Sequence, residues 1–307
     1  MPPVPHLSDR ANLPAQPEER PLAGVLWMVL TGLCFVGVQA TVKHLGGRVP
    51  AAEAAFLRYL LGLVFLIPMI PAFRHARLSR RALALFGLRG VVQGAGVIFW
   101  FYAMTRITIA EVTAMNYLSP IYITLGAALF LGEPLAARRL AAIGVAFLGA
   151  LVILRPGVRA LDAGHLAMIA TALLFAGSYL IAKRMTGEAS PQVVVGMMSL
   201  CVTIVLAPFA AAVWVMPGWA DLGWLMVVAG FATAGHYAMT LAFRAAPMAV
   251  TKPVTFLQLL WASLMGLWLF GEPIDNWVIL GGVLIAGAVV YISLREARLG
   301  ALRSRPR

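Results

Sequence analysis

Charged residues are scarce in this 307-residue chain. They make up 12% of it, against 61% hydrophobic residues, and the mean hydropathy is +0.88. Soluble globular domains carry about 25% charged and about 45–50% apolar residues. This deficit argues against a soluble domain and predicts a membrane protein. Acidic residues are scarcer than basic ones: 12 Asp and Glu stand against 24 Lys and Arg, which gives a formal net charge of +12.

Cysteine and enzyme signatures are also nearly absent. The two cysteines, Cys34 and Cys201, lie in apolar runs and are interpreted as small core residues. No HExxH, GxSxG or phosphate-binding Gly-rich loop occurs. The basic residues stand in short loops and tails, which does not fit a nucleic-acid surface. We therefore predict a protein that is not an enzyme and has no cofactor, metal or nucleic-acid partner.

The sequence does contain ten apolar runs, each bounded by charged residues, Gly or Pro. A bilayer core is crossed by about 20 apolar residues in helical form. The chain is therefore predicted to be an all-α membrane protein with ten transmembrane helices. The runs are Leu22–Leu45, Ala54–Ala72, Ala82–Met104, Ile107–Leu131, Leu140–Leu154, Leu166–Ala182, Gln192–Met216, Leu222–Phe243, Met248–Phe270 and Val278–Leu294.

Orientation follows from where Lys and Arg collect. If the N-terminus is cytoplasmic, sixteen Lys and Arg fall on the cytoplasmic side and five on the opposite side. Cytoplasmic loops carry this excess in membrane proteins. We predict a multi-pass protein of the cell (inner or plasma) membrane, with both termini inside. Residues 1–21 are expected to be a disordered tail and 295–307 a basic cytoplasmic tail.

The ten runs form a duplication. Ala110–Pro134 and Ala249–Pro273 both open at Ala and close at Gly-Glu-Pro, 139 positions apart. Thr31–Lys43 matches Thr171–Lys183 at an offset of 140. The repeats are therefore predicted at 22–155 and 163–294. Five helices is an odd number, so the second repeat must be inverted, and inverted repeats are typical of alternating-access transporters.

Several stretches carry a resemblance to a known family. They include FLRYLLG at Phe56–Gly62, the Gly87–Arg106 stretch, GHYAMTLAFRAAP at Gly235–Pro247 and the two Gly-Glu-Pro closures. In order and spacing the chain resembles the drug/metabolite transporter superfamily, specifically the EamA family of ten-helix transporters. The resemblance implies transport of amino acids, nucleotide-like metabolites, vitamins such as riboflavin, or S-adenosylmethionine. Lys252 departs from the small apolar residue that relatives tend to carry there.

Polar stripes within the runs supply candidate residues for a substrate cavity. Positions three and four apart share a helix face, and lipid offers such a face no hydrogen-bond partners. Contacts between helices, and cations that snorkel to the interface, are the alternative interpretations. The candidates are Arg89, Gln93, Trp100, Thr113, Asn116, Tyr117, His236, Tyr237, Lys252, Thr255 and Trp261.

Proton coupling has two candidates, His236 and Glu111. Histidine titrates near neutral pH, although an interhelical hydrogen bond would also explain His236. Glu111 begins a predicted helix, where a carboxylate is also favourable as a cap. Glu133 and Glu272 close the repeats and are interpreted as structural turn residues.

These observations predict a secondary transporter of a small organic metabolite. Arg58, Arg89 and Lys252 against the single acid Glu111 favour anionic or zwitterionic, amino-acid-like solutes, moved outward. Uptake of a nucleotide-like or vitamin metabolite is the alternative, and a membrane-embedded enzyme or a non-transporting membrane protein is the alternative from another class. The predicted partners are the substrate and the bilayer, with the protein a monomer or homodimer.

Overall fold

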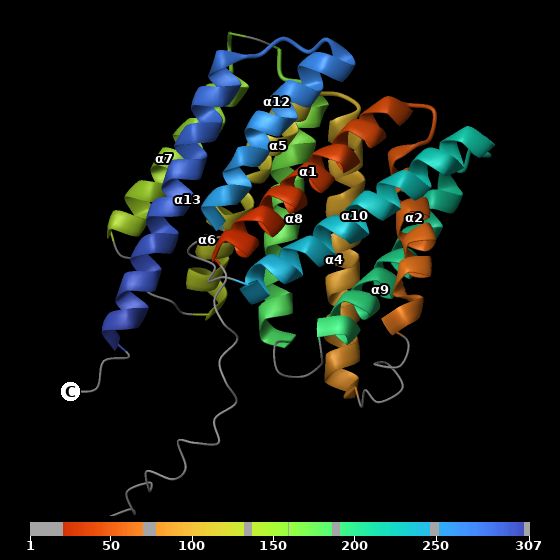
Figure 1. Ribbon diagram of the computed structural model, residues 1–307, viewed down its shortest axis with the longest axis horizontal. Helices are drawn as coiled ribbons and strands as arrows, with labels where there is room; N and C mark the ends of the chain where they lie inside the picture. The colour runs from red at the N-terminus through yellow and green to blue at the C-terminus, as the bar shows by residue number, and fades with distance from the viewer. Residues whose placement is uncertain are drawn as a thin grey trace, which may run out of the picture.

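The computed structural model describes residues 21–69, 78–131, 137–158, 160–185, 191–245 and 252–303. Within these ranges the structure is a bundle of helices (Figure 1). The tail at 1–20, the Gly-Glu-Pro of the first repeat and the last four residues lie outside the described residues. The predictions made for those segments therefore stay predictions.

The helices of the first half follow the first five apolar runs. They are α1 (Pro21–Leu45), α2 (Ala51–Gly62) continued by the 3₁₀ helix η2 (Leu63–Met69), α4 (Arg80–Met104), α5 (Ile109–Asn116), α6 (Ser119–Leu131) and α7 (Ala137–Leu154). The second half contains α8 (Ala163–Met185), α9 (Pro191–Ala212), α10 (Trp219–Ala245), the 3₁₀ helix η3 (Lys252–Phe256) leading into α12 (Leu257–Phe270), and α13 (Asn276–Arg303). Taken with their continuations, these segments correspond to the ten predicted helices.

One predicted helix is not continuous. The run at Ile107–Leu131 was expected as a single helix, but α5 ends at Asn116 and α6 starts at Ser119. Pro120, the second residue of α6, lacks an N–H and fits only the first turn of a helix. The Ser119 hydroxyl donates to the Asn116 side-chain oxygen across the break, at 3.4 Å. The candidate Thr113 on α5 and Thr124 on α6 therefore lie on two separate helices.

The two halves pack against each other in a regular pattern. α1 of the first half packs on α10 of the second, and α4 packs on α8. α2 packs on α9, and α7 on α13. If the helices of the first half correspond in order to those of the second half, the α1–α10 pair is equivalent to the α4–α8 pair. The α2–α9 pair and the α7–α13 pair are each equivalent to themselves. A two-fold relation between the repeats requires this pattern.

Four helices, α1, α4, α8 and α10, are long and apolar enough to cross a membrane by length and composition. They are the first and third helix of each repeat, and they form the two cross-repeat pairs described above. In the rest of the described chain the apolar helical stretches are shorter, at 10–17 residues. Large apolar side chains remain exposed on the bundle, such as Trp268 and Leu129, as expected for surfaces that contact lipid.

Candidate functional site

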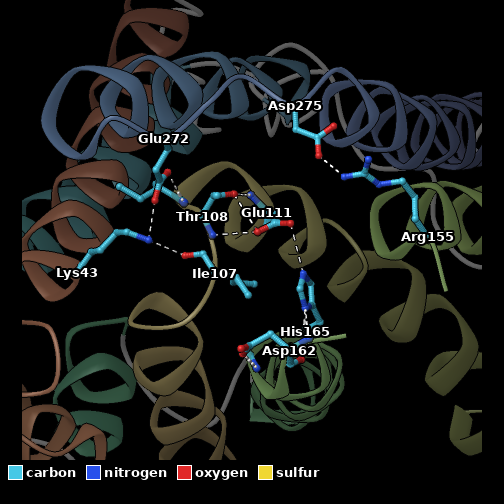
Figure 2. A network of polar contacts seen from close by, with 11 residues as sticks. Lys43, Ile107, Thr108, Glu111, Arg155, Asp162, His165, Glu272 and Asp275 are labelled. Atoms are coloured by element: carbon cyan, nitrogen blue, oxygen red, sulfur yellow. Dashed lines mark hydrogen bonds and ion pairs between the residues drawn. The ribbon is translucent and has the colours of Figure 1, made fainter. Parts of the chain in front are cut away.

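A network of polar contacts joins the two repeats at one end of the bundle (Figure 2). Lys43, near the end of α1, pairs with Glu272 just after α12, with 2.5 Å between Nζ and Oε1. Lys43 Nζ also donates to the carbonyl of Ile107, at 2.7 Å. The Ile109 N–H, at the start of α5, donates to Glu272 Oε2 at 3.0 Å. We call this group (Lys43, Ile107, Ile109 and Glu272) the clasp.

The Gly-Glu-Pro closure explains how Glu272 reaches the other repeat. Gly271 ends α12 in the left-handed conformation, with φ of 63°, which glycine adopts without steric cost. The chain turns back there, and the Glu272 N–H donates to the Gly266 carbonyl at 3.0 Å. A Cβ on Gly266 would lie 2.3 Å from Glu272 Oε2. Both glycines are therefore required to place this carboxylate.

The carboxylate of Glu272 acts as a helix cap supplied by the other repeat. The first N–H groups of a helix lack intrahelical acceptors, and the helix dipole favours an anion there. α5 also has its own capping box: the Thr108 hydroxyl accepts from the Glu111 N–H, and the Glu111 side chain accepts from the Thr108 N–H. Glu111, predicted as either a proton carrier or a cap, serves as a cap in this structure.

His165 extends the network from α8. Its Nε2 lies 3.3 Å from Glu111 Oε1, and both side chains are buried. His165 Nδ1 lies 3.1 Å from the Asp162 backbone nitrogen and 3.3 Å from the Asp162 carbonyl oxygen, so the start of α8 holds this ring in place beside Glu111. His165 was not a candidate from the sequence, because an isolated histidine at a helix start carries no motif.

Further ion pairs stand at the same end. Arg155 at the end of α7 pairs with Asp275 before α13, and Arg48 pairs with Asp221 of α10 at 3.1 Å. Glu53 of α2 accepts from the Val215 N–H at 2.9 Å. Each of these contacts also joins the first repeat to the second. This end of the bundle holds the C-terminus of α1, the N-terminus of α5 and the C-terminus of α7. Their equivalents α8, α12 and α13 each reach the same end with the opposite terminus. Equivalent helices of the two repeats therefore run in opposite directions.

A second group of polar side chains surrounds two buried arginines. Arg58 on α2 is 7% exposed and Arg89 on α4 is 8% exposed. The Arg89 Nε–H donates to the Ser178 hydroxyl of α8 at 3.3 Å, while Arg89 Nη1 is buried with no hydrogen-bond partner among the described residues. The Arg58 guanidinium stacks on the Tyr59 ring at 4.1 Å. We call Arg58, Arg89 and Ser178 the arginine site.

His236 of α10 lies within electrostatic range of both arginines. Its ring also packs edge-on against Phe35 of α1, with 5.1 Å between centroids. The next residue, Tyr237, is 61% exposed and lies on the outer surface of the bundle. Of these two neighbouring candidates, the structure brings only His236 close to Arg89.

Other predicted candidates form hydrogen bonds between helices, within the first repeat or between the repeats. Thr113 donates to the Gln39 side chain of α1 at 2.9 Å, between buried partners. The Tyr117 hydroxyl donates to the carbonyls of Thr255 and Phe256 at 3.3 and 3.4 Å. These contacts fit the alternative of hydrogen bonds between helices. Gln39 was missed from sequence because its polar partner is 74 residues away.

The two tryptophan candidates have buried N–H donors. Within the described part of the chain, Trp100 Nε1 on α4 and Trp261 Nε1 on α12 have no acceptor. Trp100 packs edge-on against Phe175 of α8, and Trp261 packs against a small cluster around Val36. Gln93 is half-buried on α4. Lys252 begins η3, but its side chain lies outside the described part of the chain.

Comparison with known proteins assigns this architecture to a transporter family. The EamA-like transporter family matches residues 22–155 and 162–294. A riboflavin transporter of Rhizobium johnstonii is 32% identical over 294 residues, which is 94% of this chain and 97% of the relative. A pseudopaline exporter, CntI, of Pseudomonas aeruginosa is 27% identical over 274 residues, 88% and 96% of the two chains.

More distant similarity agrees with this assignment. An S-adenosylmethionine uptake transporter of Rickettsia prowazekii is 24% identical over 277 residues, 90% of this chain and 94% of the relative. A crystal structure of a protein 20% identical in sequence has the same fold, with a TM-score of 0.56 over 91% of this chain and 97% of its own. The family match covers nearly the whole chain and both repeats. The chain belongs to the EamA-like transporter family, of the drug/metabolite transporter superfamily, and is a helical membrane protein.

Proposed function

We propose that the protein is a secondary transporter that exports a small organic metabolite bearing a carboxylate or phosphate, through alternating access of its two repeats. The observation that carries this proposal is the pair of buried arginines, Arg58 and Arg89. A charge inside a membrane span costs at least about 2.5 kcal/mol at the bilayer centre, and such residues mark substrate paths. An anionic substrate would compensate both cations.

The charge balance of the interior supports an anion. Among the described side chains, no carboxylate lies in ion-pair or hydrogen-bond contact with either arginine. Asp221, Glu272 and Asp275 are paired with other cations at the clasp end, while Glu53 accepts from a backbone N–H. Arg89 Nη1 is a buried, unmatched donor. Leaving such a donor unpaired costs about 1–3 kcal/mol, and more for a charged group, which a carboxylate or phosphate of the substrate would recover.

The rest of the interior favours a substrate with a ring and acceptor atoms. Trp100 and Trp261 supply indole faces and unpaired N–H donors. An anion with an aromatic or heterocyclic part would satisfy both kinds of group. Amino-acid-like zwitterions remain within the proposal, provided that another acceptor holds the ammonium group.

Uptake is the second candidate. The relative from Rhizobium johnstonii carries the name riboflavin transporter, and the heterocyclic, acceptor-rich ring of riboflavin would suit the same donors. An exporter is also among the relatives, so similarity leaves the direction open. We favour an anionic substrate over riboflavin because uncharged riboflavin would leave both arginines without a counter-charge.

The proposal is tested with purified protein in vesicles and three solutes of one shape: 3-phenylpropionate, phenylalanine and 2-phenylethylamine. Flux of each radiolabelled solute is measured in both directions, with riboflavin as a fourth solute. We expect the carboxylate to move fastest, the zwitterion more slowly and the amine slowest. A preference for the amine would contradict the proposal, and inward flux of riboflavin alone would favour the second candidate.

We propose that His236 couples transport to protons, since the other candidate, Glu111, caps helix α5. The test is the pH dependence of flux in His236→Gln, with Tyr237→Phe as the neighbouring control on the exposed surface. We expect the His236 variant to lose dependence on the proton gradient and the Tyr237 variant to keep it. If His236→Gln preserves both the rate and its pH dependence, His236 does not carry the proton.

A further inference from the structure

We propose that Lys43 and Glu272 are working residues of the transport cycle: their ion pair holds the repeats together at this end, and it must break for the interior to open there. The proposal goes beyond substrate recognition and rests on the alternating access proposed above. It assigns a moving role to the Gly-Glu-Pro closure, which sequence analysis interpreted only as a turn.

The first argument is connectivity. The clasp joins the end of α1 and the start of α5 to the end of α12, so the contacts made by Glu272 must break if the repeats part. Lys43 and Ile109 belong to the first repeat and Glu272 to the second. One carboxylate thus bridges the repeats, with Oε1 on the Lys43 ammonium and Oε2 on the Ile109 N–H. Losing this one side chain would remove both the ion pair with Lys43 and the hydrogen bond from Ile109.

The second argument is that the clasp is partly exposed to solvent, which makes its ion pair easier to separate. The side chains of Lys43 and Glu272 are 19% and 11% exposed, so both ions can be hydrated when they part. In a fully buried pair, separation would leave each charge without a counter-charge in a medium of low dielectric constant. Glu272 also follows Gly271, whose left-handed backbone forms a short pivot between α12 and the carboxylate. Hinges of such transitions are a few residues at the ends of elements.

The third argument comes from the repeat. A transporter whose halves exchange conformations is expected to carry the same closing residues in each half. Lys43 corresponds to Lys183 and Glu272 corresponds to Glu133 in the two alignments described above. The side chains of Lys183 and Glu133 lie outside the described part of the chain, so only their positions in the sequence enter the argument.

The test locks the clasp covalently. A water-soluble carbodiimide activates a carboxylate, and a contacting lysine amine then displaces the urea to form an amide, with net loss of one water. The chain has three lysines, Lys43, Lys183 and Lys252. Lys183→Arg and Lys252→Arg leave Lys43 as the sole lysine, and mass spectrometry of the cleaved protein reports the Lys43–Glu272 bond.

Opening is read by a cysteine reporter that requires no known substrate. Cys34→Ala and Cys201→Ala remove the native thiols, and Ser263→Cys places one on α12, nine residues before Glu272, or about 13 Å along the helix. The full-length protein in vesicles is then labelled with a membrane-impermeant thiol reagent from the side on which the clasp lies. The labelling rate measures how often this end opens.

Two outcomes support the proposal and three overturn it. We expect the cross-link to form and to slow labelling at least tenfold, and Glu272→Gln to speed it about tenfold, since a charge-assisted pair is worth about one such factor. Asp275→Asn, at the same end but outside the clasp, should leave the rate unchanged. A missing cross-link, labelling unaffected by the cross-link, or the same acceleration in Asp275→Asn would each overturn the proposal. Changed labelling without flux of any solute would instead count against the proposed function.

Discussion

The clasp end and the arginine site differ in whether their charged side chains are paired. At the clasp end, cations and acids from different repeats pair with each other. At the arginine site, two buried cations have no acid in contact among the described side chains. Paired charges can hold protein surfaces together, whereas an unpaired buried charge favours binding of an opposite one. This difference suggests two roles: the residues at the clasp end hold the repeats together, and those of the arginine site bind an anionic ligand.

The largest expected effect comes from removing the unmatched charge. Arg89→Gln should lower flux of 3-phenylpropionate about 10- to 100-fold, because a hydrogen bond to a charged group is worth about 1.5–3 kcal/mol. Arg89→Lys keeps the charge but loses the fork of donors, so it should retain intermediate flux. Melting temperature in detergent serves as the control for folding. An equal loss in both variants would show that the fork, not the charge, matters.

A smaller effect is expected from Gly90, the residue after Arg89. A Cβ there would lie 2.7 Å from the Cys201 Cβ and 3.1 Å from its carbonyl carbon. Backbone atoms cannot yield easily, so Gly90→Ala should destabilise the protein by about 1–3 kcal/mol, as overpacking does. Gly87→Ala on the same helix meets no atom within 4 Å and is the matched control. Equal melting temperatures for the two variants would show that α4 and α9 do not approach so closely.

The corresponding change at the clasp is Gly266→Ala. The atom in its way is Glu272 Oε2, at the end of a flexible side chain, so the carboxylate can move aside. We expect a loss of stability of about 1 kcal/mol, near the lower end of overpacking costs, together with faster labelling of the Ser263→Cys reporter. Gly287→Ala on α13 meets no atom within 4 Å and should not change labelling. Unchanged labelling in Gly266→Ala would show that Glu272 is placed without this glycine.

The helices and their duplication could be predicted from sequence because both depend on local composition and spacing. The helix break after Asn116 was missed, although Pro120 marks it, because hydrophobicity continues through the break. The clasp could not be predicted, since Lys43 and Glu272 are 229 positions apart and the repeated Gly-Glu-Pro around Glu272 indicates a turn without indicating its partner. Arg89 was a candidate because a charge inside an apolar run is conspicuous, whereas its partner Ser178 resembles any small helix residue.

The smallest expected effect concerns Arg155 and Asp275, which also join the repeats at the clasp end. Their side chains are about a quarter exposed, at 24% and 27%, and exposed ion pairs contribute about 0–1 kcal/mol. Neither residue caps a helix of the opposite repeat, which is the added role of Glu272. The double variant Arg155→Gln/Asp275→Asn should therefore shift the melting temperature little and leave reporter labelling unchanged. If it accelerates labelling as much as Glu272→Gln does, closure is spread over all the ion pairs at this end, and the helix cap at Ile109 contributes nothing special.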